Sequence, residues 1–179
     1  MRINKIFVLF LFSVFLLYGC GIRATHQVGT WETGKVVNLQ FADKVVVVHT
    51  HNFSEYLRHE FGYKLPFDDI KIEGEASTCL IVGLKGILPG YAIINDSEIN
   101  NVNPNAKVVD ISVKELIFKK NFSHTGYIAK MKLEVKNGDK VEEISASGNA
   151  PLFRTAMEKA CEEAGQKIAE LIEKRKSSM

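Results

Sequence analysis

The chain has 179 residues, of which 46% are hydrophobic and 25% charged, a composition that fits one globular domain and excludes a disordered chain. The formal net charge of +2 comes from Arg2 and Lys5 near the start, and without them 21 basic and 21 acidic side chains balance. The rest of the chain is neutral, so its charge gives no reason to expect a nucleic-acid partner.

The first 20 residues predict export to the cell envelope. A basic start (residues 1–5) precedes an apolar run (6–17) that is shorter than the roughly 20 residues of a membrane-spanning helix, as in a secretory signal peptide. Residues 17–20, Leu-Tyr-Gly-Cys, resemble the lipobox of bacterial lipoproteins, in which the cysteine is lipidated and the chain is cut before it. We therefore expect a signal peptide at 1–19 and a lipid on Cys20. The alternative is an ordinary signal peptide cut nearby.

The segment that follows predicts a tether and a location. Residues 20–34 are polar and glycine-rich, which indicates a lipidated cysteine followed by a flexible linker. The residue after Cys20 is Gly21 rather than aspartate, and an aspartate there resembles the inner-membrane retention signal of Gram-negative lipoproteins. We expect a lipid-anchored protein of the outer membrane that faces the periplasm.

Two strands and a short helix are expected next. Residues 36–39 and 45–48 are rich in valine, and four consecutive valines fit a strand with both faces covered. Asn52 with Glu55 three residues later matches a capping box, which predicts a helix of about ten residues. The apolar residues that would share one face of this helix are Phe53, Tyr56, Leu57 and Phe61.

The middle of the chain is less clear. Short strands are expected at 70–72 and 91–94, with a loop rich in Asn, Asp and Ser at 95–105. Residues 78–88 contain an apolar run that fits either a strand or a helix. Gly83 and Gly86 disfavour a helix, so a strand is the favoured interpretation.

The second half predicts a sheet covered by a helix. Alternating apolar and polar residues at 109–118, 127–135 and 141–148 indicate three antiparallel strands, with a tight turn at Asn137-Gly138. Asn149 would cap a final helix of about 24 residues that carries one apolar stripe. The expected fold class is α+β. It comprises an antiparallel β-sheet (a meander) packed against a long C-terminal helix and a short N-terminal helix in two layers, as a single domain over residues 35–176.

Two cysteines remain if Cys20 carries lipid. An exported protein meets an oxidising compartment, so Cys79 and Cys161 are candidates for a disulfide. Two buried free thiols are the alternative, because cysteine is often a small core residue.

Three histidines form the best candidate for a metal site. His49 and His51 are two apart, which puts them on one side of a strand, and His59 follows nearby. Together with Asp68 or Asp69 they would supply zinc ligands. The alternative is three solvated histidines around a turn.

The motifs of common enzymes are absent from the sequence. It contains no GxSxG, no HExxH and no phosphate-binding loop. We therefore expect no catalytic residue and no cofactor.

The layout resembles one family. A lipobox, a Gly-Tyr pair (Gly62-Tyr63 or Gly90-Tyr91), a strand pair, a hairpin at Asn137-Gly138-Asp139 and a long terminal helix resemble the YajG-type lipoproteins of Gram-negative bacteria. The resemblance covers roughly residues 108–176, and the segment 67–105 departs from it. It carries no catalytic residues. In plan the chain is also similar to the lipopolysaccharide-assembly lipoprotein and to auxiliary lipoproteins of lipid transporters.

These observations predict a membrane-anchored, non-enzymatic envelope lipoprotein. Its domain would be a binding or scaffold module for an envelope protein partner, auxiliary to envelope assembly or transport. The alternative function is a periplasmic lipoprotein that binds a metal or a small ligand through His49, His51 and His59.

Overall fold

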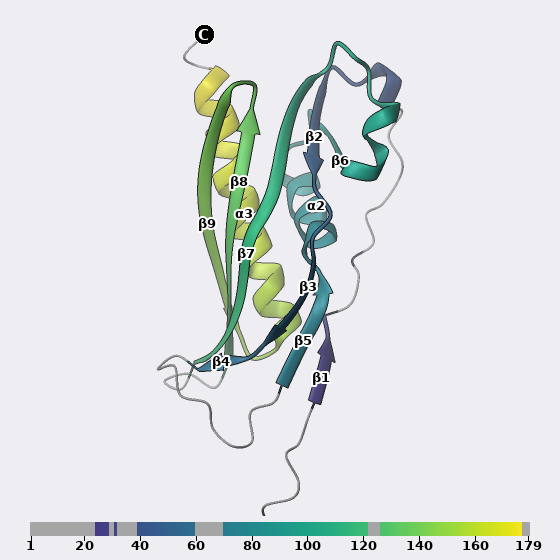
Figure 1. Ribbon diagram of the computed structural model, residues 1–179. Coiled ribbons are helices and arrows are strands. Elements are labelled where there is room, and N and C mark those ends of the chain that lie inside the picture. Colours follow the sequence, from purple (N-terminus) through teal and green to yellow (C-terminus); the bar gives the residue numbers. More distant parts are fainter. Residues whose placement is uncertain (1–23, 29–30, 32–38, 60–69, 122–125, 177–179) are drawn as a thin grey trace, which may run out of the picture.

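Figure 1 shows the computed structural model, which describes residues 24–28, 31, 39–59, 70–121 and 126–176. The fold is α+β, with two mixed sheets and a long C-terminal helix. The predicted signal peptide, Cys20, most of the strand expected at 36–39, and Asp68 with Asp69 lie outside the described residues.

The larger sheet has the strand order β6-β2-β7-β8-β9, and β4 pairs with the far end of β7. Its strands are β2 (Lys44–Val48), β4 (Arg58–His59), β6 (Ala92–Asn95), β7 (Lys107–Asn121), β8 (Gly126–Asn137) and β9 (Lys140–Ala150). The three-strand meander β7-β8-β9 is confirmed, with its turn at Gly138, whose φ is +61°. The expectation of a purely antiparallel sheet is wrong, because β2 runs parallel to both β6 and β7.

The valines of β2 explain the position of that strand inside the sheet. All four are fully buried. Val46 and Val48 join the main core, whereas Val45 and Val47 pack on the opposite face in a second cluster. A strand that is apolar on both faces requires cover on both faces, so it lies between two parallel neighbours rather than at an edge.

The smaller sheet has the order β1-β5-β3, built from β1 (Ala24–Gln27), β5 (Ile70–Glu75) and β3 (Asn52–Tyr56). The short helix predicted from Asn52 is wrong, because these residues form β3, antiparallel to β5. Phe53 is buried while its neighbours Asn52 and Ser54 are exposed, which is the alternation of a strand. The local capping signal is outweighed by the ladder to β5, which satisfies the same backbone groups.

The tether predicted for residues 20–34 is corrected in its described part. Residues 24–27 form β1, which pairs in parallel with β5. Val28 and Trp31 are buried, and the indole N–H of Trp31 donates a hydrogen bond to Glu158 at 3.1 Å. The folded domain therefore begins well before residue 35.

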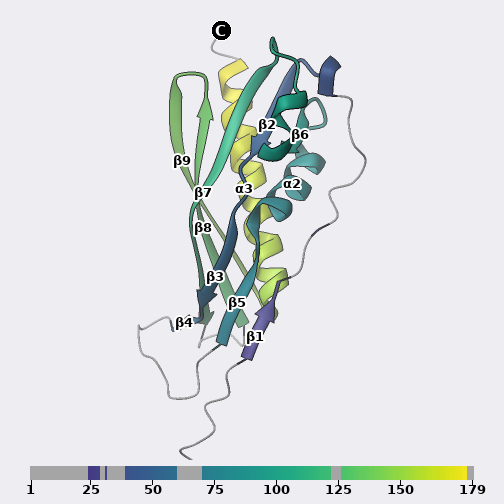
Figure 2. The same cartoon turned by 45° about the vertical axis from the view of Figure 1, so that its right-hand side comes forward.

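Two helices cover the same face of the larger sheet, as Figure 2 shows: α2 (Ala76–Ile87) and α3 (Phe153–Lys176). The favoured strand at 78–88 is wrong, because this segment is α2. Gly83 lies where α2 crosses α3, and a Cβ there would be only 3.2 Å from the carbonyl oxygen of Cys161. The close packing of the helices outweighs the low helix propensity of glycine.

The C-terminal helix has the predicted length of 24 residues but begins later than expected. Asn149 and Ala150 still belong to β9, and α3 starts at Phe153. Its predicted apolar stripe is buried against the sheet and α2, and consists of Phe153, Met157, Cys161, Ala164, Ile168 and Ile172.

A disulfide joins the two helices. Cys79 of α2 and Cys161 of α3 are bonded, with their Cα atoms 6.1 Å apart. The two residues are 82 positions apart in sequence. Cross-linking a loop of that length restricts the unfolded chain and would stabilise the fold by about 4 kcal/mol in the chain-entropy model.

The contact between α3 and β9 generates a test of the packing. A Cβ on Gly148 would lie 2.0 Å from the carbonyl oxygen of Ala156, so Gly148→Ala should push the helix off the strand. We expect a loss of about 3 kcal/mol in the free energy of unfolding, or failure to fold.

Gly86→Ala is the matched control, because nothing lies within 4 Å of a Cβ at this exposed position near the end of α2. It should raise the free energy of unfolding by up to about 1 kcal/mol. Urea denaturation measures both variants, and equal stabilities would contradict the close contact at Gly148.

Candidate functional site

A polar cluster lies at the carboxyl ends of the parallel strands β2 and β6. Thr50 follows β2, and its hydroxyl donates to one carboxylate oxygen of Asp96 at 2.7 Å while its backbone N–H donates to the other at 3.2 Å. The Thr50 hydroxyl is the main cause that holds the pKa of Asp96 below its usual range. The carboxylate is thereby kept ionised at the surface.

His49 lies between two carboxylates of this cluster. Its Nδ1 is 3.6 Å from Asp96, and its Nε2 is 3.5 Å from Asp110 on β7. All three side chains are about one-third or more exposed. The arrangement orients the imidazole ring, since each ring nitrogen faces a carboxylate.

The other two histidines do not join His49. The backbone N–H of His49 donates to Ile111, whereas His59 on β4 pairs with Lys120, nine residues further along β7. Nine residues of strand span roughly 30 Å. His51 is half-buried in the connection between β2 and β3. Within the described residues no group of three His, Cys, Asp or Glu could hold a metal ion, so the predicted histidine trio does not form.

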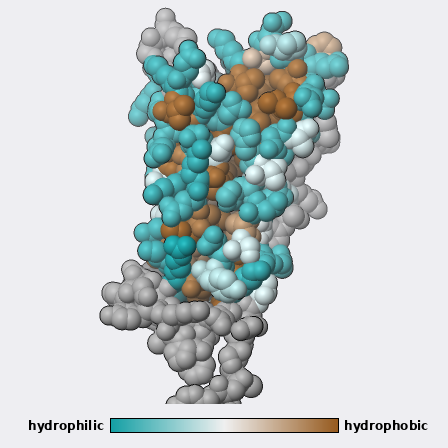
Figure 3. All heavy atoms as spheres, in the orientation of Figure 1, coloured by the Kyte–Doolittle hydropathy of each residue, from teal (hydrophilic) through white to brown (hydrophobic). Residues whose placement is uncertain are grey.

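The face of β7-β8-β9 opposite the helices is open and rich in lysine. Two ion pairs cross it, Lys132–Glu115 at 3.2 Å and Lys114–Glu134 at 2.9 Å. Figure 3 shows that the surface along this side is largely hydrophilic. The alternation of polar residues in the sequence predicted this wet face.

A shallow hollow of about 580 Å³ lies on this open face, beside a bulge between Val113 and Glu115. The hollow extends from the open face to side chains of α3 at the edge of β9. The residues around it are Glu115, Ile117, Lys130, Met131, Lys132, Ser145, Ala146, Ser147, Glu163 and Lys167. Three lysines, two carboxylates and two serine hydroxyls surround the hollow together with three apolar residues, so it offers both charged and apolar contacts, as protein interfaces do.

The free edge of β9 is covered by side chains of α3, a feature that no local pattern in the sequence indicates. Lys167 donates to the carbonyl oxygen of Ser145 at 2.7 Å, and Glu163 accepts from the N–H of Ser147 at 3.0 Å. Lys159 donates to the carbonyl oxygen of Asn149 at 3.2 Å. An added strand would have to displace these three side chains, so this half of the edge is protected from β-pairing.

Lys167 also fixes Glu163. Its ammonium group lies 2.5 Å from the carboxylate and is the main cause that holds the pKa of Glu163 below its usual range. The two residues are four apart on α3, a spacing at which side chains meet on a helix, and they also reach the backbone of β9.

No helix in the described part of the chain is long and apolar enough to cross a membrane.

His51 gives the stability of the fold a testable pH dependence. Burial lowers its pKa from the ordinary value of 6.5, and the negative charge of Glu55 offsets this only in part. Below about pH 6.5 the unfolded chain binds a proton more readily than the folded protein, so stability should fall as the pH drops through this range.

We expect His51→Gln to reduce the difference in unfolding free energy between pH 7.5 and pH 5.5, measured by urea denaturation. Lys140→Gln, at an exposed position, should keep the wild-type difference. An unchanged pH dependence in His51→Gln would contradict the role of burial at His51.

No protein-family model and no curated protein matches this chain. Three solved structures show distant similarity. The first is an uncharacterized protein, with 8% identity, a TM-score of 0.46, and coverage of 86% of this chain and 97% of that one.

The second is a dodecamer of a PelC point variant from Paraburkholderia phytofirmans, with 13% identity, a TM-score of 0.32, and coverage of 78% of this chain and 91% of that one. The third is a protein from Helicobacter pylori described as a neuraminyllactose-binding hemagglutinin homolog, with 12% identity, a TM-score of 0.33, and coverage of 84% and 100%. Similarity at this level says nothing about the function of this chain.

Proposed function

We propose that the protein is a non-enzymatic envelope lipoprotein, anchored to the outer membrane by a lipid on Cys20. Its domain faces the periplasm and binds an envelope protein partner. The domain has two layers in this proposal, with α2 and α3 behind the larger sheet. The opposite face of β7-β8-β9 is the surface offered to the partner.

The disulfide between Cys79 and Cys161 is the observation that carries the proposal. Structural disulfides persist in exported proteins and are rare in reducing compartments. The bonded pair therefore supports export on grounds independent of the signal peptide and the lipobox. With that pair bonded, Cys20 is the remaining cysteine of the three in the chain.

The open face supports the binding role. It is long, polar, and interrupted by a hollow rather than by a deep cleft. The covered edge of β9 makes the open face, rather than strand addition, the better candidate for contact with a partner. The YajG-type resemblance favours the same kind of role.

The anchor is tested by labelling cells with a palmitate analogue. Cys20→Ser should abolish the label and leave a precursor or a soluble form. The double variant Cys79→Ala/Cys161→Ala is the control and should keep the label, because it removes the other two cysteines of the chain. Label that survives in Cys20→Ser would overturn the lipid anchor.

The partner surface is tested by placing a photo-crosslinking amino acid at Lys132, beside the hollow. Irradiation of cells should yield adducts with envelope proteins, identified by mass spectrometry. The matched control replaces Gln166, which is exposed on α3, and should give far fewer adducts. Equal adducts from both positions, or none from Lys132, would count against the open face as the binding surface.

A further inference from the structure

We infer that one end of the domain is a membrane-contact surface that lies against the headgroups of anionic phospholipids. We call it the anchor end and define it by four exposed or half-exposed residues: Tyr56, Arg58, Lys119 and Leu152. The inference rests on the proposed lipid at Cys20 and extends it by assigning an orientation to the domain.

The start of β1 lies close in sequence to the proposed lipid anchor. The first described strand, β1, begins at Ala24. Three residues separate it from Cys20. Four Cα–Cα steps reach at most about 14 Å. A lipid on Cys20 would therefore hold the start of β1 within that distance of the bilayer surface.

Parts of both sheets lie at the same end of the domain as the start of β1. Ala24 pairs with Ile70, and the carbonyl oxygen of Ile70 accepts from the N–H of Leu57. The next residue, Arg58, pairs with Lys119 on β7. These neighbouring strand pairs show that the anchor end includes parts of both sheets. Figure 1 shows β1, β4 and the end of β7 at the same end of the molecule.

Leu152 belongs to the same end. Lys120 pairs with Tyr127 and Tyr127 with Ala150, so the end of β9 lies at the same end of the sheet as the end of β7, with β8 between them. Leu152 follows two residues later and is 66% exposed, and Tyr56 is 57% exposed. Exposed apolar side chains also occur at the other end, Phe41 and Val141 among them, so the distance from Cys20 and the charges distinguish the anchor end.

The chemistry of these residues matches a bilayer surface. Tyrosine is enriched where headgroups meet the acyl region, and an aliphatic side chain can enter that boundary. Arginine and lysine are attracted to anionic headgroups within about one Debye length, which is roughly 8 Å at physiological ionic strength. Arg58 is partly compensated by Glu55 at 3.7 Å, whereas among the described residues no carboxylate pairs with Lys119 or Lys130.

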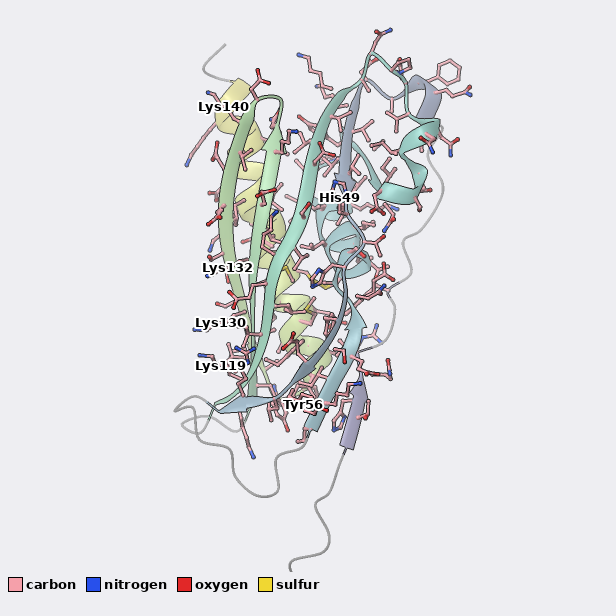
Figure 4. The ribbon with its side chains drawn as sticks, viewed as in Figure 1. His49, Tyr56, Lys119, Lys130, Lys132 and Lys140 are labelled. Carbon is pink, nitrogen blue, oxygen red and sulfur yellow. A yellow bond between two sulfur atoms is a disulfide. The ribbon has the colours of Figure 1, made fainter. Side chains whose placement is uncertain are left out.

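The opposite end provides the contrast. Lys119 pairs with Ile128 on β8, and nine residues further along β8 lies Asn137, which pairs with Lys140. The hairpin tip is therefore roughly 30 Å from the anchor end. Figure 4 shows Lys119 and Tyr56 near one end of the domain and Lys140 at the other. We call the domain upright when its anchor end faces the bilayer. In that orientation Lys140, a lysine of the same sheet, lies far from the membrane and serves as a reference position.

The experiment uses the mature lipidated protein in nanodiscs of phosphatidylethanolamine and phosphatidylglycerol that contain a gadolinium-chelating lipid. Mass spectrometry first verifies the lipid on Cys20. The enhancement of amide relaxation should be at least fivefold larger at Arg58 and Lys119 than at Lys140. Nanodiscs of phosphatidylcholine should reduce this difference.

Charge reversal then tests the lysines. A lysine close to an anionic membrane surface raises the fraction of molecules whose anchor end lies on the membrane by about fivefold. Lys119→Glu/Lys130→Glu should therefore reduce the enhancement at Arg58 severalfold on the anionic nanodiscs. Lys136→Glu/Lys140→Glu makes the same change of charge towards the hairpin tip and should leave the enhancement unchanged.

The outcomes separate the two proposals. A protein without lipid on Cys20 overturns both the proposed anchor and this inference. A lipidated protein with equal enhancement along the whole of β8 lies flat and overturns the upright orientation alone. Equal effects of the two charge-reversed variants overturn the anionic-lipid contact.

Discussion

The close contact between α3 and β9 is the constraint on which the rest of the fold depends. The backbone of the helix passes so near Gly148 that no side chain fits there. Small residues on the helix, among them Ala156 and Ala160, make this approach feasible. Because α3 is fixed on β9, its neighbour α2 is fixed as well, through the crossing at Gly83 and the disulfide from Cys79 to Cys161.

The same contact determines which surfaces remain available. Helix α3 lies so close to β9 that Lys159, Glu163 and Lys167 reach the free backbone groups of the strand. The edge is thereby closed over this half, and the helices occupy one face of the sheet. The opposite face of β7-β8-β9 and the two ends of the domain are left for contact with other molecules. Both proposals therefore concern surfaces that the packing of α3 leaves uncovered.

The sequence predicted the elements in which one strong periodic signal extends over many residues. The meander, its turn at Gly138 and the length of α3 belong to this group. Strand β2 was predicted from a different signal, its run of four valines. The parallel neighbours of β2 were not predictable, because they depend on the crossover from β6 to β7 rather than on any local pattern.

The wrong predictions share a physical cause. Where local signals are weak, packing between segments that are distant in sequence determines the secondary structure. Residues 52–56 carry a helix-cap pattern but pair with β5, and residues 76–87 carry glycines but pack on α3. The tether prediction failed because β1 is four residues long and mostly polar, so only its pairing with β5 makes it a strand. The prediction of a histidine site was wrong for a related reason. His49 and His59 are close in sequence, but the chain between them runs along β7, so they lie near opposite ends of that strand.

The direction of β1 links the fold to the proposed anchor. β1 runs parallel to β5, so both strands start at the same end of the small sheet, and Ala24 lies beside Ile70. An antiparallel strand of the same length would begin at the other end of β5, beside the connection to α2. Lipid on Cys20 would then hold a different part of the domain at the membrane, away from Tyr56 and Lys119. If Cys20 carries the proposed lipid, the direction of this four-residue strand would select which end of the whole domain faces the bilayer.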